Sequence, residues 1–140
     1  MQENIESSAA KFLAAPSFAV AGASRDRSKY GNKVFQALVA SGRTVYPLNL
    51  SAPEVEGQTA YATIADLSVV PESLSIVTPP QVTRKVIQQA IAAGVKNIWM
   101  QPGAEDAQAS QAAREAGISV IDNGSCVLVL LAIEARTKRH

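Results

Sequence analysis

Residues 18–49 read FAVAGASRDRSKYGNKVFQALVASGRTVYPLN, and the fold prediction starts from them. The apolar run 18–21 predicts a strand, and apolar residues at helical spacing predict a helix over 31–41. Between them, Gly22, Ala23 and Ser24 predict a turn of small residues, and 44–48 predicts a second strand. Small residues let the backbone approach a phosphate closely, and the amides at a helix N-terminus favour negative charge. The stretch therefore predicts a strand-turn-helix unit that binds a phosphate-containing ligand.

The same stretch concentrates positive charge. Between positions 22 and 43 there is one acid, Asp26, and the net charge is +4, against +1 for the whole chain. The basic residues are Arg25, Arg27, Lys29, Lys33 and Arg43. A cationic loop after the first strand favours an anionic ligand, and an ordinary solvated surface is the alternative for any single one of these residues.

Length and composition indicate one compact domain. With 140 residues and 47% hydrophobic content, the chain holds enough apolar material for a single core and leaves no room for a second catalytic domain. We expect residues 1–15 to form a covering helix, ended by Pro16, and residues 16–140 to form the ligand-binding domain. The near-neutral net charge disfavours nucleic-acid and membrane-surface partners. Small open sheets often pair, so a homodimer is an open alternative.

Metal, disulfide and targeting signals are weak. The chain has one cysteine, Cys126, and one histidine, His140, so we expect neither an intramolecular disulfide nor a metal site. Its first six residues are acidic where a signal peptide would be basic, and its longest apolar run, 127–133, is too short to span a bilayer. We expect a cytoplasmic protein, with an organelle matrix as the open alternative.

Three glycines mark the junctions between helices and strands. Gly42, Gly94 and Gly117 each follow a helical pattern and precede an apolar strand, where a left-handed C-terminal cap is expected. Repeated helix-glycine-strand units predict a Rossmann-like, doubly wound, mostly parallel α/β sheet of five strands with helices on both faces. Residues 49–73 are predicted to be mostly loop, with brief pairing at 58–61 and a helical turn at 64–67. The apolar run 127–133 is predicted to be a helix that packs back on the sheet.

Ligands of open parallel sheets bind at the carboxyl ends of the strands. A nicotinamide dinucleotide normally requires an acid at the end of the second strand, but that position is Asn49, and Gly22 is not followed by a second glycine two residues later. These departures disfavour plain NAD binding and favour a ligand with more phosphate.

Six short motifs carry a resemblance to a known family. They are VAGAS at 20–24, KYGN at 29–32, VYPLN at 45–49, TPP at 78–80, IWMQPG at 98–103 and AREAG at 113–117. Together they resemble the small stand-alone CoA-binding-domain family, which is similar to the N-terminal domain of the succinyl-CoA synthetase α subunit. The resemblance covers about residues 16–126 and implies a Rossmann-type fold with coenzyme A, or an acyl-CoA, as the small-molecule ligand. It does not imply the ligase reaction, because the synthetase's phosphorylated histidine belongs to a further domain.

The resemblance also implies which segments contact CoA. The phosphates would lie at Gly22, Ala23, Ser24, Lys29, Tyr30 and Gly31, with Arg25 or Arg27 near the 3′-phosphate. Asn49 and Leu50 would lie beside the adenosine. Thr78, Pro79 and Pro80 would line the nucleotide and pantetheine path, and Gln101, Pro102 and Gly103 would border the outgoing pantetheine arm.

Catalytic patterns do not emerge from the sequence. There is no paired-carboxylate, Ser-His-Asp or metal-ligand spacing, and Cys126, without a core histidine, fits a small buried residue better than a nucleophile or a thiol that pairs with CoA. The prediction is a domain that binds CoA or an acyl-CoA and is non-enzymatic or at most accessory to an enzyme. The alternatives are a small NAD(P)-dependent oxidoreductase and a regulatory module that has lost ligand binding.

Overall fold

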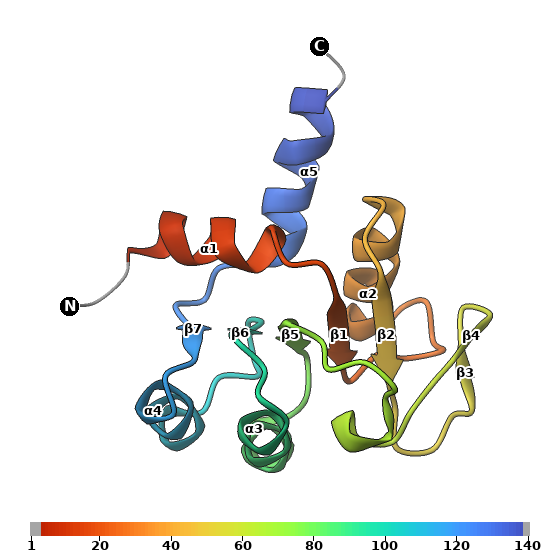
Figure 1. Ribbon diagram of the computed structural model, residues 1–140. Coiled ribbons are helices and arrows are strands. Elements are labelled where there is room, and N and C mark those ends of the chain that lie inside the picture. The colour runs from red at the N-terminus through yellow and green to blue at the C-terminus, as the bar shows by residue number, and fades with distance from the viewer. Residues whose placement is uncertain (1–3, 139–140) are drawn as a thin grey trace.

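Five parallel strands form the central sheet of the computed structural model, which describes residues 4–138 (Figure 1). The strands are β1 (Phe18–Ala21), β2 (Val45–Leu48), β5 (Ser73–Ile76), β6 (Asn97–Met100) and β7 (Ser119–Ile121). They lie in the order β2-β1-β5-β6-β7, and each neighbouring pair is parallel. The predicted Rossmann-like α/β fold is confirmed. The first three residues of the acidic start and His140 lie outside the described residues.

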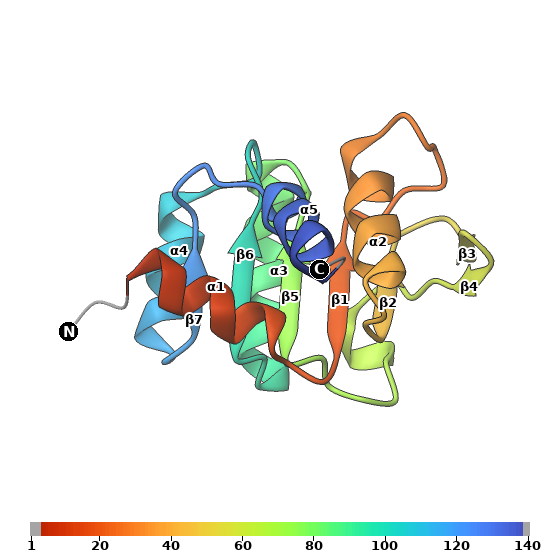
Figure 2. The ribbon, with the colours of Figure 1, turned by 90° about the horizontal axis from the view of Figure 1, so that it is seen from above.

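Helices cover both faces of this sheet (Figures 1 and 2). One face carries α1 (Ile5–Leu13), α2 (Tyr30–Ala40) and α5 (Val127–Lys138), and the other carries α3 (Pro80–Ala93) and α4 (Ala107–Glu115). The three glycines after α2, α3 and α4 have φ values of 88°, 86° and 84°. Their predicted left-handed conformation is confirmed, and it lets each helix end directly before a strand.

Alternating side chains of the strands build one core on each face. Ala19 and Ala21 of β1 contribute to the core under α3 and α4, whereas Phe18 and Val20 contribute to the core under α1 and α2. On the second face, Phe12 of α1 is fully buried. Its ring packs edge-on against Phe18 and Trp99, with centroids 5.5 and 5.3 Å away. Helix α1 is therefore integral to this core.

The segment after β2 holds more structure than the sequence predicted. A hairpin of β3 (Glu54–Val55) and β4 (Gln58–Thr59) precedes a short 3-10 helix, η1 (Ile64–Asp66). The helical turn predicted at 64–67 is present, and the pairing predicted at 58–61 is confined to 58–59 and has a partner strand that the sequence did not predict. The hairpin turns through Glu56 and Gly57, both with positive φ, as a tight two-residue hairpin turn requires.

Helix α5 forms where the sequence predicted it, but it packs on the sheet face only near its start. Val127 and Leu131 are buried, whereas the side chains of Val129 and Ile133 are 59% and 49% exposed. Figure 1 shows the helix rising away from the sheet. Arg43 anchors it, because its guanidinium donates two hydrogen bonds of 2.8 Å to the Glu134 carboxylate. The homodimer that the sequence leaves open as an alternative stays a prediction.

Two glycines bring α2 against the turn that follows β1. A Cβ atom on Gly31 would lie 2.0 Å from the carbonyl oxygen of Gly22, and a Cβ on Gly22 would lie 2.9 Å from the carbonyl oxygen of Val77. Gly22 also has a φ of 91°, which L side chains rarely adopt. The start of α2 and the ends of β1 and β5 therefore meet at a distance that only glycine allows.

We expect Gly31→Ala to lower the free energy of unfolding by about 2–4 kcal/mol, because the new methyl group must displace backbone. Gly94→Ala is the control: its φ of 86° disfavours a side chain, but no atom lies within 4 Å of the added carbon, so it should cost about 1 kcal/mol. Urea unfolding followed by circular dichroism measures both. Equal losses would contradict the close-contact explanation.

Candidate functional site

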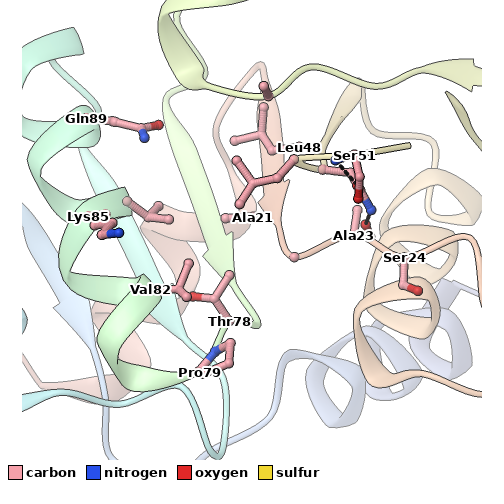
Figure 3. Close-up of a pocket in the computed structure, with 15 residues that line it drawn as sticks. Ala21, Ala23, Ser24, Leu48, Ser51, Thr78, Pro79, Val82, Lys85 and Gln89 are labelled. Atoms are coloured by element: carbon pink, nitrogen blue, oxygen red, sulfur yellow. Dashed lines mark hydrogen bonds between the residues drawn. The ribbon is translucent and has the colours of Figure 1, made fainter. Parts of the chain in front are cut away.

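A cavity of about 320 Å³ lies at the carboxyl ends of β1, β2 and β5. From β1 the chain continues to β2 on one side, and the later strands β5, β6 and β7 extend the sheet on the other. The loops after β1 and β5 therefore diverge, which creates the crevice in which open α/β sheets bind their ligands. Figure 3 shows the cavity between the loops after β1 and β2 and one face of α3.

Seven of the sixteen predicted site residues line this cavity. They are Gly22, Ala23, Ser24, Asn49, Leu50, Thr78 and Pro79. Three segments distant in sequence, the turns after β1, β2 and β5, are thus brought together. The contacts of these residues with a ligand stay predictions. The other nine do not line the cavity: Arg25, Arg27, Lys29, Tyr30, Gly31, Pro80, Gln101, Pro102 and Gly103.

Asn49 connects two of the cavity's loops. Its amide nitrogen donates to the carbonyl oxygen of Ala23 at 2.8 Å, and its side-chain oxygen accepts from the backbone amides of Ser51 and Ala52, each at 2.8 Å. At the position where a dinucleotide-binding protein carries an acid, this chain uses a neutral amide to fix the turn after β1 to the turn after β2.

The basic loop, residues 25–30, is attached to the β3–β4 hairpin. Arg27 donates from Nε and Nη2 to the Glu56 carboxylate at 3.1 and 3.0 Å, and the buried Asn32 donates to Glu56 at 2.9 Å and to the Ser24 carbonyl at 2.8 Å. The bonds from Arg27 and then from Asn32 hold the pKa of Glu56 below its ordinary value. Arg27, predicted near a phosphate, already has a carboxylate partner.

Tyr30 and Gln101 belong to a second polar cluster, apart from the cavity lining. The Tyr30 hydroxyl is hydrogen-bonded to the Cys126 thiol and donates to the Gln101 side-chain oxygen, which also accepts from the amide of Val127 at the start of α5. Gln101 is fully buried and donates to the Ser75 hydroxyl. Burial, followed by the contact with Cys126, raises the pKa of Tyr30 well above its usual range. This cluster joins α2, the ends of β5 and β6, and the start of α5.

The sequence prediction missed the wall that α3 contributes. Val82, Lys85, Val86 and Gln89 line the cavity, at positions i, i+3, i+4 and i+7 of one helical face. The apolar spacing of Val82 and Val86, extended to the polar residues on the same face, would have included Lys85 and Gln89. The sequence pattern does not show which way this face of the helix points, because that depends on where α3 crosses the sheet.

The cavity suits binding by backbone and apolar contacts. The residues that line it are mostly small or apolar, and none of them is a carboxylate, a histidine or a cysteine. Within residues 4–138 there is no group of three or more metal-ligating side chains, and no helix is long and apolar enough to cross a membrane.

Comparison with known proteins identifies the family. The family model described as the CoA binding domain matches residues 16–132. The chain belongs to the CoA-binding domain family. The resemblance drawn from residues 16–126 is confirmed. Over 81 residues, the chain is 33% identical to the α subunit of an ADP-forming acetate–CoA ligase II from Pyrococcus furiosus. The match covers 57% of the chain but only 18% of that curated relative's length.

Solved structures share the fold. A conserved hypothetical protein from Pyrococcus furiosus is 34% identical, with a TM-score of 0.75, and the match covers 81% of this CoA-binding domain and 97% of that chain. The dinucleotide-forming acetyl-coenzyme A synthetase 1 from Candidatus Korarchaeum cryptofilum is 25% identical, with a TM-score of 0.70, over 78% of this chain and 26% of the synthetase. The same fold thus occurs both in a protein of similar length and as part of a larger synthetase.

We expect protonation of Glu56 to release the β3–β4 hairpin from the basic loop. Because the pKa of Glu56 is lowered in the folded protein, its contribution is complete above the ordinary value of 4.5 and is lost as the pH falls through the folded value. Amide hydrogen exchange, corrected for intrinsic rates, should show the protection of Ala60, whose amide donates to Pro53, falling between about pH 6 and about pH 3.

Glu56→Gln should lower that protection at both pH values and abolish the pH response. Glu54→Gln, on the exposed start of the same hairpin, is the matched control and should behave as the unmodified protein does. A pH response that persists in Glu56→Gln would show that another group holds the hairpin.

Proposed function

We propose that the cavity at the ends of β1, β2 and β5 binds coenzyme A or an acyl-CoA. The observation that carries this proposal is the position of the cavity: in a chain of the CoA-binding domain family, it lies at the switch point of the sheet, against the turn of Gly22, Ala23 and Ser24. The small turn residues leave the backbone accessible to a phosphate, as the sequence predicted.

The volume and the lining of the cavity support binding of the adenosine part of CoA within it. A volume of about 320 Å³ is at the small end of the range of ligand pockets and suits the adenosine part of CoA better than the whole molecule. Leu48, Leu50 and Val82 offer apolar contact to a base, and the turn of Gly22, Ala23 and Ser24 lies at the edge where the pyrophosphate would leave. The pantetheine arm then extends along the crest of the sheet towards Gln101, Pro102 and Gly103.

Binding without chemistry is the role that we propose. Tyr30 and Gln101 are occupied with each other, with Cys126 and with the start of α5, and the residues that line the cavity include no carboxylate, histidine or cysteine. The acetate–CoA ligase subunit named above is several times longer than the matched region, so its reaction is not carried over to this chain.

Calorimetric titration with CoA, dephospho-CoA and NAD at one salt concentration tests the proposal. We expect CoA to bind, and Val82→Phe to weaken that binding by roughly tenfold or more, because the larger ring fills the cavity. Val129→Phe makes the same change on the exposed side of α5 and is the control. Binding of NAD with no heat from CoA would move the protein to the oxidoreductase class, and equal CoA affinity in Val82→Phe would place the ligand elsewhere.

A further inference from the structure

The cavity has one charged side chain. Among the described residues that line it, Lys85 of α3 is the only acid or base, and the rest are apolar or neutral and polar. The basic loop, where the sequence placed the cations for phosphate, contributes only the uncharged Ser24. The charged side chain that lines the cavity thus comes from α3, the helix of which the sequence prediction assigned only Pro80 to the site.

Helix α3 presents Lys85 to the cavity by its register. Val82 and Val86 are one turn apart on the same face, and Val86 is buried, which fixes the rotation of the helix. Gln89, one turn after Lys85, is held by a hydrogen bond of 3.4 Å from the amide of Ile64. Lys85 therefore lies on a helical face whose orientation is set by its neighbours on both sides.

Lys85 differs in its pairing from two arginines near it, Arg27 and Arg84. No described residue forms an ion pair with it, whereas Arg27 is paired with Glu56 and the adjacent Arg84 is paired with Asp106 at 2.9 Å. Asp106 is the N-cap of α4, so Arg84 is directed away from the cavity. An unpaired ammonium group beside an apolar cavity is suited to an anionic group of the ligand.

The position of Lys85 indicates which anionic group that is. In Figure 3 it lies on α3, across the cavity from Ala23 and Ser24, with Leu48 and Val82 between them. A ligand that places its pyrophosphate at the turn after β1 and its base against Leu48 must carry a second anion to reach Lys85. CoA has such a group, because its ribose bears a phosphate in addition to the pyrophosphate.

We propose that Lys85 pairs with the ribose 3′-phosphate of bound CoA and is the residue by which this cavity distinguishes CoA from dephospho-CoA. The inference rests on the proposed function. It assigns the contact to α3 in place of Arg25 or Arg27, the residues that the family resemblance suggested.

Calorimetric titrations of Lys85→Gln, Lys85→Arg and Arg84→Gln with CoA and dephospho-CoA test this assignment. We expect Lys85→Gln to weaken CoA binding by roughly tenfold and to change the affinity for dephospho-CoA by less than about twofold. Lys85→Arg should keep most of the preference for CoA. Arg84→Gln removes the same charge one residue earlier, outside the cavity, and should leave the preference as it is in the unmodified protein.

The outcomes separate the inference from the proposed function. Tight CoA binding by the unmodified protein, with the same preference over dephospho-CoA in Lys85→Gln, would overturn the role of Lys85 alone. Equal weakening of both ligands by Lys85→Gln would also overturn it, because the lysine would then act on a group that both ligands share. Failure of the unmodified protein to bind CoA would overturn the proposed function and this inference with it.

Discussion

The close approach of α2 to the turn after β1 is the constraint on which the site depends. Gly31 packs against the carbonyl of Gly22, and Gly22 in turn packs against Val77 and Thr78 at the end of β5. Three chain segments meet there at distances that exclude a Cβ atom. Because these backbones cannot shift independently, the turn after β1 has one position relative to β5. Backbone contacts alone therefore fix this wall of the cavity. The same contact explains why Gly31, which the family resemblance places at the phosphates, is buried against backbone.

Around this contact, most polar side chains serve to position loops. Asn49 joins the turns after β1 and β2, and Glu56 joins the hairpin to the basic loop through Arg27 and Asn32. Gln101 connects Tyr30, Ser75 and the first amide of α5. Among the described residues, no buried side-chain nitrogen or oxygen lacks a hydrogen-bond partner. Polar groups at the crest are thus largely satisfied within the protein, which leaves a preformed, mostly apolar cavity.

The sequence predicted the sheet well because its signals are local. Apolar runs, helical spacing and the glycines at 42, 94 and 117 each depend on residues within one or two turns of each other, and the structure follows them. The turns after β1, β2 and β5 also follow, because parallel strands place their carboxyl ends at one edge. What the sequence could not supply were partners far along the chain. Arg27 and Glu56 are 29 residues apart, and nothing near either residue indicates that they pair. For the same reason β3 was missed, and α5 was expected to pack along a sheet face on which it only begins.

Ion pairing determines which cations of the protein are available to a ligand. A cluster of basic residues in the sequence gives a high local net charge. An anionic ligand, however, is attracted mainly to the cations that remain unpaired where it binds. In this fold Arg27 and Arg43 are neutralised by Glu56 and Glu134, carboxylates from other parts of the chain. These two pairs reduce the excess positive charge of residues 22–43, whereas Lys85 of α3 forms no ion pair with a described residue and lines the cavity. If Lys85 pairs with the 3′-phosphate as we propose, specificity for a phosphorylated ribose depends on one face of α3, and affinity for the rest of the ligand depends on apolar and backbone contacts.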